Sequence, residues 1–264
     1  MGLCKKLLIG DGITALITLI LCLSLGLTVV SRNITSTFFS RCEKFNEYDC
    51  QKLWDAFQQA YVNKDPCKVP VEAYDPLIAA APFKHQCNKT MFWSKTKDVV
   101  HGLTAKRNDC FVTLEDTLLG SVLDNLTWCG KEGSNDTFTT GCPGWSECVN
   151  NPVRSFWNRS SAAFADVACG NVTAMLNGSI NTPFNPTSNF ASVEVPRFKA
   201  SRVKKLNVVM VIQKNAISNC NHSSLKELEA NMTKRSITYT CKDVSESRIQ
   251  ECGSKPEIAC GACW

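Results

Sequence analysis

The stretch Phe190-Ala-Ser-Val-Glu-Val195 predicts how the second half of the chain is arranged. Its side chains alternate, so on a β-strand one face is apolar and the other presents Glu194 between an aromatic ring and a hydroxyl. Pro196 then ends the strand, because proline has no N–H for a β-ladder. A single carboxylate at a strand end suits the stabilisation of a cation in a cleft. The ordinary alternative is an edge strand whose polar face lies in water.

Further short strands are expected around this stretch, with one helix between the last two. The strands are predicted over Val172–Leu176, Asn207–Ile212 and Ser236–Thr240, and the helix over Ser224–Met232. Strands that alternate with a helix are typical of a small, mostly parallel sheet. We therefore expect an α/β subdomain in the C-terminal half.

The first half of the chain is expected to be mainly helical. Apolar residues at helical spacing predict an amphipathic helix over Gln51–Tyr61. Thr113, with Asp116 three residues later, resembles a capping box before a helix over Leu114–Leu119. Other elements are predicted as helices over Tyr74–Ala81, Lys97–Lys106 and Val153–Cys169, a strand over Met91–Ser94 and a loop over Gly130–Gly144. The predicted fold class is α+β or α/β, disulfide-rich, with a cleft between the two halves.

Cysteine usage indicates an oxidising compartment. Of the 16 Cys, all except Cys4 and Cys22 lie between Cys42 and Cys263, which leaves 14 for a disulfide framework. Zinc is the weaker alternative, because Cys260-Gly-Ala-Cys263 has no second cysteine pair or histidine cluster beside it. The net charge of +5 includes no basic run, so nucleic-acid binding has little support. Nine sequons also favour export: Asn33, Asn88, Asn125, Asn135, Asn158, Asn171, Asn177, Asn221 and Asn231.

The N-terminus predicts a membrane anchor. Lys5 and Lys6 precede an almost wholly apolar run, long enough to span a bilayer with the N-terminus in the cytosol. A cleaved signal peptide is the alternative, but the run is long for one and shows no convincing small-x-small cleavage site. The predicted order is a tail (1–6), a transmembrane signal-anchor (7–30), a stalk (31–40), a mainly helical subdomain (41–86 and 113–168) and an α/β subdomain (87–112 and 169–264).

The candidate chemistry depends on acids and tryptophans. The sequence contains no glycine-rich phosphate loop and no Gly-x-Ser-x-Gly elbow, and we interpret His85 and His101 as surface or structural residues. Carboxylates stabilise an oxocarbenium-like state, and Trp rings stack on a cationic heterocycle. Together they suit the cleavage of an N-glycosidic bond to a charged ring. The candidates are Glu194, Glu115, Asp124, Trp93 and Trp157.

Several candidates also have an ordinary structural interpretation. Glu115 lies in the first turn of a predicted helix, where the helix dipole favours a carboxylate. Trp157 shares a helix face with Ser161, and a Trp at helical spacing is commonly a core residue. Asp124 can share a site with Glu115 only if the intervening helix ends early, for instance at Gly120.

Five segments, in order, carry a family resemblance: Met91-Phe-Trp-Ser-Lys-Thr-Lys-Asp98, Thr113-Leu-Glu-Asp-Thr-Leu-Leu-Gly120, Leu126-Thr-Trp-Cys-Gly130, Asn151-Pro-Val-Arg-Ser-Phe-Trp157 and Phe190-Ala-Ser-Val-Glu-Val195. They closely resemble the ADP-ribosyl cyclase / cyclic ADP-ribose hydrolase family. The likeness runs from about Arg41 to Cys260, and the N-terminal anchor resembles the type II lymphocyte ectoenzyme branch.

The resemblance implies a role for each matching residue. Glu194 matches the catalytic glutamate that stabilises or captures the ribosyl cation, and Glu115 matches the acid that contacts the carboxamide and influences cyclisation against hydrolysis. Trp93 and Trp157 match the rings that hold nicotinamide. The further substrate contacts implied are Asp124, Ser161, Lys97, Asn189 and Phe190. Asn189 stands where relatives carry Thr or Phe, and Ala191 replaces a Gly, so the ratio of cyclase to hydrolase activity is left open.

The resemblance also implies a reaction. NAD is converted to nicotinamide, ADP-ribose and cyclic ADP-ribose; cyclic ADP-ribose is hydrolysed; NADP undergoes base exchange with nicotinic acid. No metal or cofactor is expected, and the catalytic domain would lie outside the cytosol on a single-pass type II cell-membrane protein. The choice between monomer and homodimer is left open. Two rivals remain: an adhesion or receptor ectodomain that kept the fold with reduced activity, and a glycosidase acting on O-linked sugars.

Six disulfides carry over from the family by position: Cys42–Cys50, Cys67–Cys148, Cys87–Cys169, Cys129–Cys142, Cys220–Cys241 and Cys252–Cys260. Cys110 and Cys263 are left over. They pair with each other, or Cys263 competes for Cys252.

Overall fold

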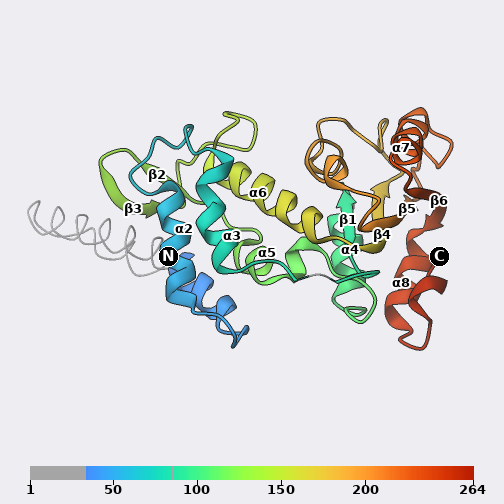
Figure 1. The fold of residues 1–264 in the computed structure, drawn as a ribbon, viewed down its shortest axis with the longest axis horizontal. Helices are drawn as coiled ribbons and strands as arrows, with labels where there is room; N and C mark the ends of the chain where they lie inside the picture. Colours follow the sequence, from blue (N-terminus) through green and yellow to red (C-terminus); the bar gives the residue numbers. More distant parts are fainter. Residues whose placement is uncertain (1–33, 85) are drawn as a thin grey trace, which may run out of the picture. The chain divides into compact units, whose positions relative to one another are not determined.

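The computed structural model describes residues 34–84 and 86–264, which divide into two compact units (Figure 1). Unit 1 contains the described residues up to Ala80 together with Val122–Ser155, and unit 2 contains Ala81–Ser121 and Phe156–Trp264. The predicted tail and transmembrane anchor lie outside the described residues. Within the described part, none of the helices has the length and apolar character needed to cross a bilayer.

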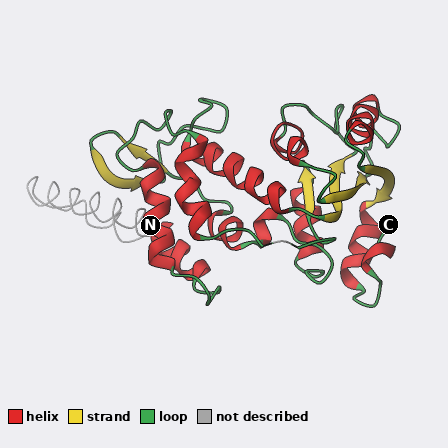
Figure 2. Ribbon diagram, in the orientation of Figure 1, coloured by secondary structure: helices red, strands yellow, loops and turns green. Residues whose placement is uncertain are grey.

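Unit 1 is built mainly on helices (Figure 2), and their buried aromatic side chains form its core. Helix α2 (Cys50–Tyr61) begins at Asp49, whose carboxylate accepts the backbone N–H groups of the first turn. A 3-10 turn, η1 (Val71–Tyr74), leads into α3 (Asp75–Ala80). The ring of Phe57 packs edge-on against Trp128, and the Trp128 indole N–H donates to the hydroxyl of Tyr74 at 2.9 Å. The two predicted helices of this region are confirmed.

A polar stalk was predicted over residues 31–40, but the residues of this segment that the structure describes do not form one. Residues 34–42 are helical, and the ring of Phe38 is buried against Trp54 and Phe57, with ring centroids 5.0 and 5.6 Å away. The Ser and Thr residues of the segment suggested a linker. Ile34 and Phe38, four residues apart on one helix face, instead bury it against α2.

A β-hairpin occupies part of the loop predicted over Gly130–Gly144. Strands β2 (Cys129–Lys131) and β3 (Ser134–Phe138) pair antiparallel. Gly133 allows the tight turn between them, because its φ of +80° lies in the left-handed region that glycine adopts without strain. The predicted disulfide Cys129–Cys142 closes the segment. The loop prediction was wrong because Gly, Ser and Asn are as typical of a hairpin turn as of a longer loop.

Unit 2 contains a four-stranded parallel sheet in the order β1-β4-β5-β6. The strands are β1 (Met91–Ser94), β4 (Gly170–Asn177), β5 (Val203–Ile212) and β6 (Thr238–Ser245). Both faces are apolar, as is usual for a parallel sheet that helices cover on both sides. The predicted small parallel sheet is therefore confirmed.

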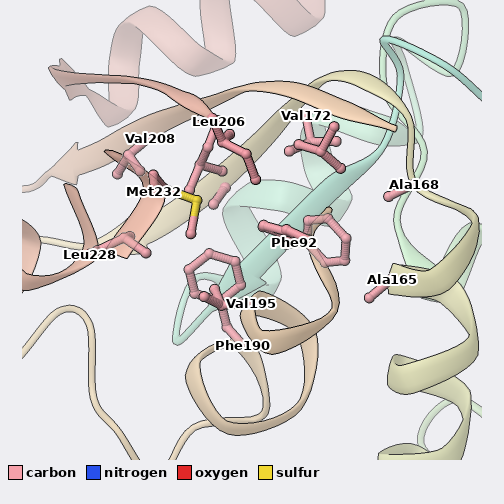
Figure 3. Packing of buried hydrophobic residues seen from close by; sticks show 14 of the residues in the cluster. Phe92, Ala165, Ala168, Val172, Phe190, Val195, Leu206, Val208, Leu228 and Met232 are labelled. Carbon is pink, nitrogen blue, oxygen red and sulfur yellow. The ribbon is translucent and has the colours of Figure 1, made fainter. Parts of the chain in front are cut away.

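Each face of the sheet packs into its own core cluster. One cluster contains Phe92, Val172 and Leu206, together with residues of α6 (Pro152–Val167) and α7 (Ser223–Lys234) (Figure 3). The other contains Met175 and Val209, together with residues of α4 (Lys97–Thr104) and α8 (Glu246–Ser254). Helix α8, which begins at the N-cap Ser245, was not predicted from the sequence.

The stretch Phe190–Val195 is helical, so the strand prediction was wrong. A π-helical turn, η3 (Phe190–Glu194), runs into a 3-10 turn, η4 (Val195–Arg197), and the Val195 N–H donates to the Phe190 carbonyl. Figure 3 shows Phe190 and Val195 on this turn beside Phe92 of β1. Six residues are too few for periodicity to decide, because the apolar positions that alternate on a strand also fit one buried side of a tight helical turn.

Seven disulfides join the described cysteines, each within one unit. Five of the six predicted pairs are confirmed. The pair Cys252–Cys260 was wrong: Cys260 bonds to Cys110, and Cys252 bonds to Cys263. Helix α8 buries Cys252 beside the C-terminal Cys263, which leaves Cys260 for Cys110. Both cysteines of the weakly zinc-like Cys260–Cys263 motif are thus oxidised.

Gly120 lies where backbone segments approach closely, and its substitution tests this part of the fold. It lies in α5 (Leu118–Leu123), and a Cβ there would overlap the Leu114 carbonyl and approach the Glu115 Cα to 2.7 Å. We expect Gly120→Ala to lower the free energy of unfolding by about 1–3 kcal/mol. The matched control is Gly102→Ala on the exposed side of α4, where a Cβ meets nothing within 4 Å.

The control should stabilise by about 0.5–1 kcal/mol, because alanine is the better helix former. Denaturant unfolding of both variants measures the difference. Equal effects of the two substitutions would contradict the close approach at Gly120.

Candidate active site

The turn that carries Glu115 is fixed by its neighbour Asp116. Asp116 Oδ2 accepts both the backbone N–H and the hydroxyl of Thr113, each at 2.8 Å, and Asp116 Oδ1 accepts the Thr104 hydroxyl at 3.2 Å. These bonds hold the 3-10 turn η2 (Leu114–Asp116). The capping box predicted from Thr113 and Asp116 is confirmed, and the Glu115 carboxylate is left for other partners.

Glu115 points to two aromatic side chains of unit 2. The Trp93 indole N–H donates to Glu115 Oε2 at 3.1 Å, and His101 Nε2 lies 3.6 Å from the same oxygen. Trp93 lies near the carboxyl end of edge strand β1, and His101 lies on the helix α4 that follows it. In parallel sheets, ligands bind outside the carboxyl ends of the strands. The two rings meet edge to face, with centroids 5.8 Å apart.

The Glu115 carboxyl is held in its ionised form. Burial acts to raise its pKa, since its side chain is only 12% exposed, but the nearby His101 imidazole and the hydrogen bond from Trp93 outweigh burial and lower the pKa below its ordinary value. Glu115 is therefore a fixed negative charge at neutral pH.

Glu194 is the opposite case, a buried acid at the end of the π-helical turn. It is 7% exposed, and burial raises its pKa from 4.5 to about 8. A hydrogen bond with Ser161 opposes the shift, and the negative charge of Glu115 adds to it. Two coupled carboxyls whose pKa values are pushed apart are a common sign of a catalytic site.

Helix α6 contributes two predicted residues one turn apart. Ser161 is buried and supplies the hydroxyl that meets Glu194. Trp157 is half-buried, packing partly against the core cluster beside its neighbour Phe156, which is fully buried. Part of the Trp157 surface thus stays available to a ligand.

A chain of interactions in unit 2 joins four of the predicted residues. It runs from Trp93 to Glu115, then to Glu194 and Ser161. Ser161 shares helix α6 with Trp157. A buried acid destabilises the fold unless it is paired or neutral, so two coupled buried carboxyls indicate a function other than stabilising the fold.

The other predicted contacts have different settings. Phe190 is 1% exposed and packs on Phe92 and Phe184, so its ring is a core residue. Asn189 and Lys97 are half-buried at the starts of η3 and α4. Asp124 belongs to unit 1, directly after α5, and its backbone carbonyl accepts from the Arg41 guanidinium at 2.8 Å. Substrate binding by these four residues stays a prediction.

His101 is the residue that sequence reasoning missed. It was set aside because no nucleophile accompanied it. Only the fold brings α4 and η2 together, and no spacing between His101 and Glu115 signals the contact.

His85 lies outside the described residues. The other grouping of metal-type ligands in the described chain is Asp109 with Cys110 and Cys260, whose sulfurs are joined in a disulfide.

A family model described as ADP-ribosyl cyclase matches residues 31–261. The chain is 41% identical to rat ADP-ribosyl cyclase/cyclic ADP-ribose hydrolase 1, over 81% of this chain and 72% of the relative. It is 30% identical to the Aplysia californica ADP-ribosyl cyclase/cyclic ADP-ribose hydrolase, over 83% and 86%. Its structure resembles porcine CD38 bound to a covalent intermediate, ribo-F-ribose-5'-phosphate, with a TM-score of 0.75 and 37% identity, covering 80% of this chain and 96% of that one.

The raised pKa of Glu194 predicts a stability that depends on pH. Between pH 4.5 and about 8 the folded state keeps a proton that the unfolded state has lost, so the carboxyl destabilises the fold increasingly as pH rises. Glu194→Gln carries no such proton. As pH rises through this window, the free energy of unfolding of Glu194→Gln should therefore increase relative to that of wild type by up to about 1.4 kcal/mol per pH unit.

Denaturant unfolding at a series of pH values measures this difference. The control is Glu227→Gln on the exposed side of α7, which should follow wild type at every pH. A constant difference between Glu194→Gln and wild type would show that the Glu194 carboxyl is not held neutral by burial.

Proposed function

The chain belongs to the ADP-ribosyl cyclase family, and from that membership we propose that it is an enzyme that cleaves the nicotinamide–ribose bond of NAD(P). Its products are nicotinamide, ADP-ribose and cyclic ADP-ribose, and it also hydrolyses cyclic ADP-ribose. The observation that carries this function is the buried Glu194, hydrogen-bonded to Ser161 and coupled to the charged Glu115. The proposed substrates are NAD(P) and cyclic ADP-ribose, and the proposed chemistry uses no cofactor.

The first step breaks the N-glycosidic bond. The nicotinamide ring nitrogen takes both bonding electrons and leaves as neutral nicotinamide, and the ribose C1 becomes an oxocarbenium-like centre. The ionised Glu194 stabilises or captures this cation. Before cleavage the substrate ring is itself cationic, and a nearby cation favours the ionised form of a carboxyl. Substrate binding therefore ionises the acid at the moment when its charge is needed.

The second step divides the products. When water attacks the ribose C1, it gives up a proton and the product is ADP-ribose. When the adenine of the same molecule attacks, the product is cyclic ADP-ribose. Trp93 and Trp157 are suited to stacking on the nicotinamide and restricting the substrate. Glu115, held by Trp93, is placed to accept from the carboxamide and to influence which attack wins.

The pairing of a protonated Glu194 with an ionised Glu115 favours this function over the two rivals. An adhesion ectodomain has no use for a buried carboxyl with a raised pKa, and each such group destabilises the fold. A glycosidase acting on O-linked sugars needs an acid to protonate its leaving group, whereas nicotinamide leaves without protonation.

Glu194→Gln tests the function directly. We expect nicotinamide release from NAD to fall by roughly 10²–10³-fold or more, because the amide cannot supply the negative charge. Wild-type kcat/KM should rise with pH up to the pKa of Glu194 at about 8, because the ionised form is the active one. The midpoint for kcat should lie at lower pH, since the cationic substrate favours ionisation.

Nicotinamide release is followed by chromatography, with Glu227→Gln as the control that should match wild type. If wild type releases no more nicotinamide from NAD than Glu194→Gln does, the proposal that the protein is an enzyme is wrong. Turnover of aryl O-glycosides in place of NAD would favour the glycosidase.

We further propose that the catalytic region faces the outside of the cell, behind a type II anchor over residues 7–30. Seven disulfides among the described residues support an oxidising compartment. Intact cells expressing the full chain should release nicotinamide from NAD in the medium, because NAD is too polar to cross a bilayer. Activity that appears only after permeabilisation with detergent would contradict this placement.

A further inference from the structure

We propose that His101 is a positioning residue that holds the Glu115 carboxylate in place and thereby sets the balance between cyclisation and hydrolysis. The inference rests on the proposed function, since it concerns how the NAD-derived products are divided. It gives a role to a histidine that has no nucleophile beside it and that the sequence marks only as surface or structural.

The geometry joins three elements of unit 2 at one oxygen atom. Glu115 Oε2, on the turn η2, receives the Trp93 indole N–H from strand β1 and faces His101 Nε2 from helix α4. The His101 ring also meets the Trp93 ring at an interplanar angle of 82°. Each member of this triangle thus touches the other two. Removing the histidine side chain takes away one of the two side chains that face the carboxylate.

The neighbouring acid cannot replace Glu115 as the partner of His101. Asp116 is engaged by Thr113 and Thr104 through both of its carboxylate oxygens. The two acids of this turn therefore have different roles. Asp116 stabilises the backbone, and Glu115 faces the side chains of Trp93 and His101. A histidine at this position therefore acts on the acid that is coupled to Glu194.

The surrounding charges are largely occupied elsewhere. Helix α8 packs against α4, but its Arg248 pairs with Glu251 at 2.8 Å, and Lys255 pairs with the same acid. Glu246 accepts hydrogen bonds from two glutamine side chains. On α4 itself, the other charged residues are Lys97 and Asp98 in the first turn. The His101 side chain is 27% exposed, and its Nε2 lies within ion-pair distance of the Glu115 carboxylate.

The link to product choice passes through charge and position. Glu115 is near enough to Glu194 for its charge to act on that acid. With His101 gone, the Glu115 carboxylate loses one of the two side chains that face it, and its orientation about the Trp93 hydrogen bond is less restricted. A carboxylate that turns offers the carboxamide and the reacting ribose a different charge distribution. The partition between water and adenine should respond more than the first bond cleavage does.

The test is a double-mutant cycle on the full chain. Wild type, His101→Phe, Glu115→Gln and the double variant are compared for total nicotinamide release and for the fraction of product that is cyclic ADP-ribose. We expect His101→Phe alone to change that fraction at least about threefold, the order found for residues in contact. In the Glu115→Gln background, the same substitution should change the fraction no further.

Rescue and control variants separate positioning from packing. His101→Gln, which keeps a side-chain N–H donor, should return the product fraction toward wild type, whereas His101→Phe keeps the ring and loses the donor. His222→Phe is the histidine control: it removes the N-cap of α7 and should lower the melting temperature without moving the product fraction.

Three outcomes overturn the inference. The first is an unchanged product fraction in both His101→Phe and His101→Gln. The second is an equal effect of His101→Phe with and without Glu115, which would mean that the ring acts through packing alone. Both leave the proposed function intact as long as wild type releases nicotinamide. The third is a wild-type protein that releases none, which overturns the proposed function and this inference together.

Discussion

The burial of the Glu194 carboxyl is the constraint on which the rest of unit 2 depends. A carboxyl taken out of water is tolerated when it keeps its proton or gains partners. Here the carboxyl keeps its proton, and Ser161 of α6 supplies one hydrogen-bond partner. The π-helical turn that carries Glu194 packs on the sheet, whose core residues make the surroundings apolar. The same environment that makes the acid unfavourable in the resting protein makes its charge strong when a cation forms beside it. Stability and reactivity are therefore set by one group.

Glu115 shows how a second acid next to the first is kept ionised. The two carboxyls differ mainly in the groups that face them: Glu194 has a single hydroxyl, and Glu115 has an indole N–H and an imidazole. The Thr113–Asp116 cap fixes the turn so that Glu115 presents its side chain to those donors. Gly120 lets the next helix approach the turn closely enough to keep it there. The position of the Glu115 charge thus depends on an uncharged contact, the close approach of Gly120 to the backbone of Leu114 and Glu115.

Much of this could be predicted from the sequence, and the failures have physical causes. Long periodic segments such as α2 and α6, and the strongly apolar strands β4 and β5, are specified locally. The stretch Phe190–Val195 was mistaken for a strand because it is shorter than the window in which periods of 2 and 3.6 differ. The resemblance paired Cys260 with Cys252, and this was wrong because chain spacing does not say which sulfurs meet. His101 was missed because its contact with Glu115 exists only after folding brings α4 beside η2.

The disulfide pattern has a consequence for how the chain is made. Both units are assembled from two separated segments, and the bonds Cys67–Cys148 and Cys87–Cys169 close across sequence separations of 81 and 82 residues. Synthesis proceeds from the N-terminus, so Cys67, Cys87 and Cys110 all emerge as thiols well before their partners. Cys110 waits longest, through 150 further residues, until Cys260 arrives. Nascent chains must therefore carry several reactive thiols at once, and their maturation depends on thiol–disulfide exchange that undoes premature bonds.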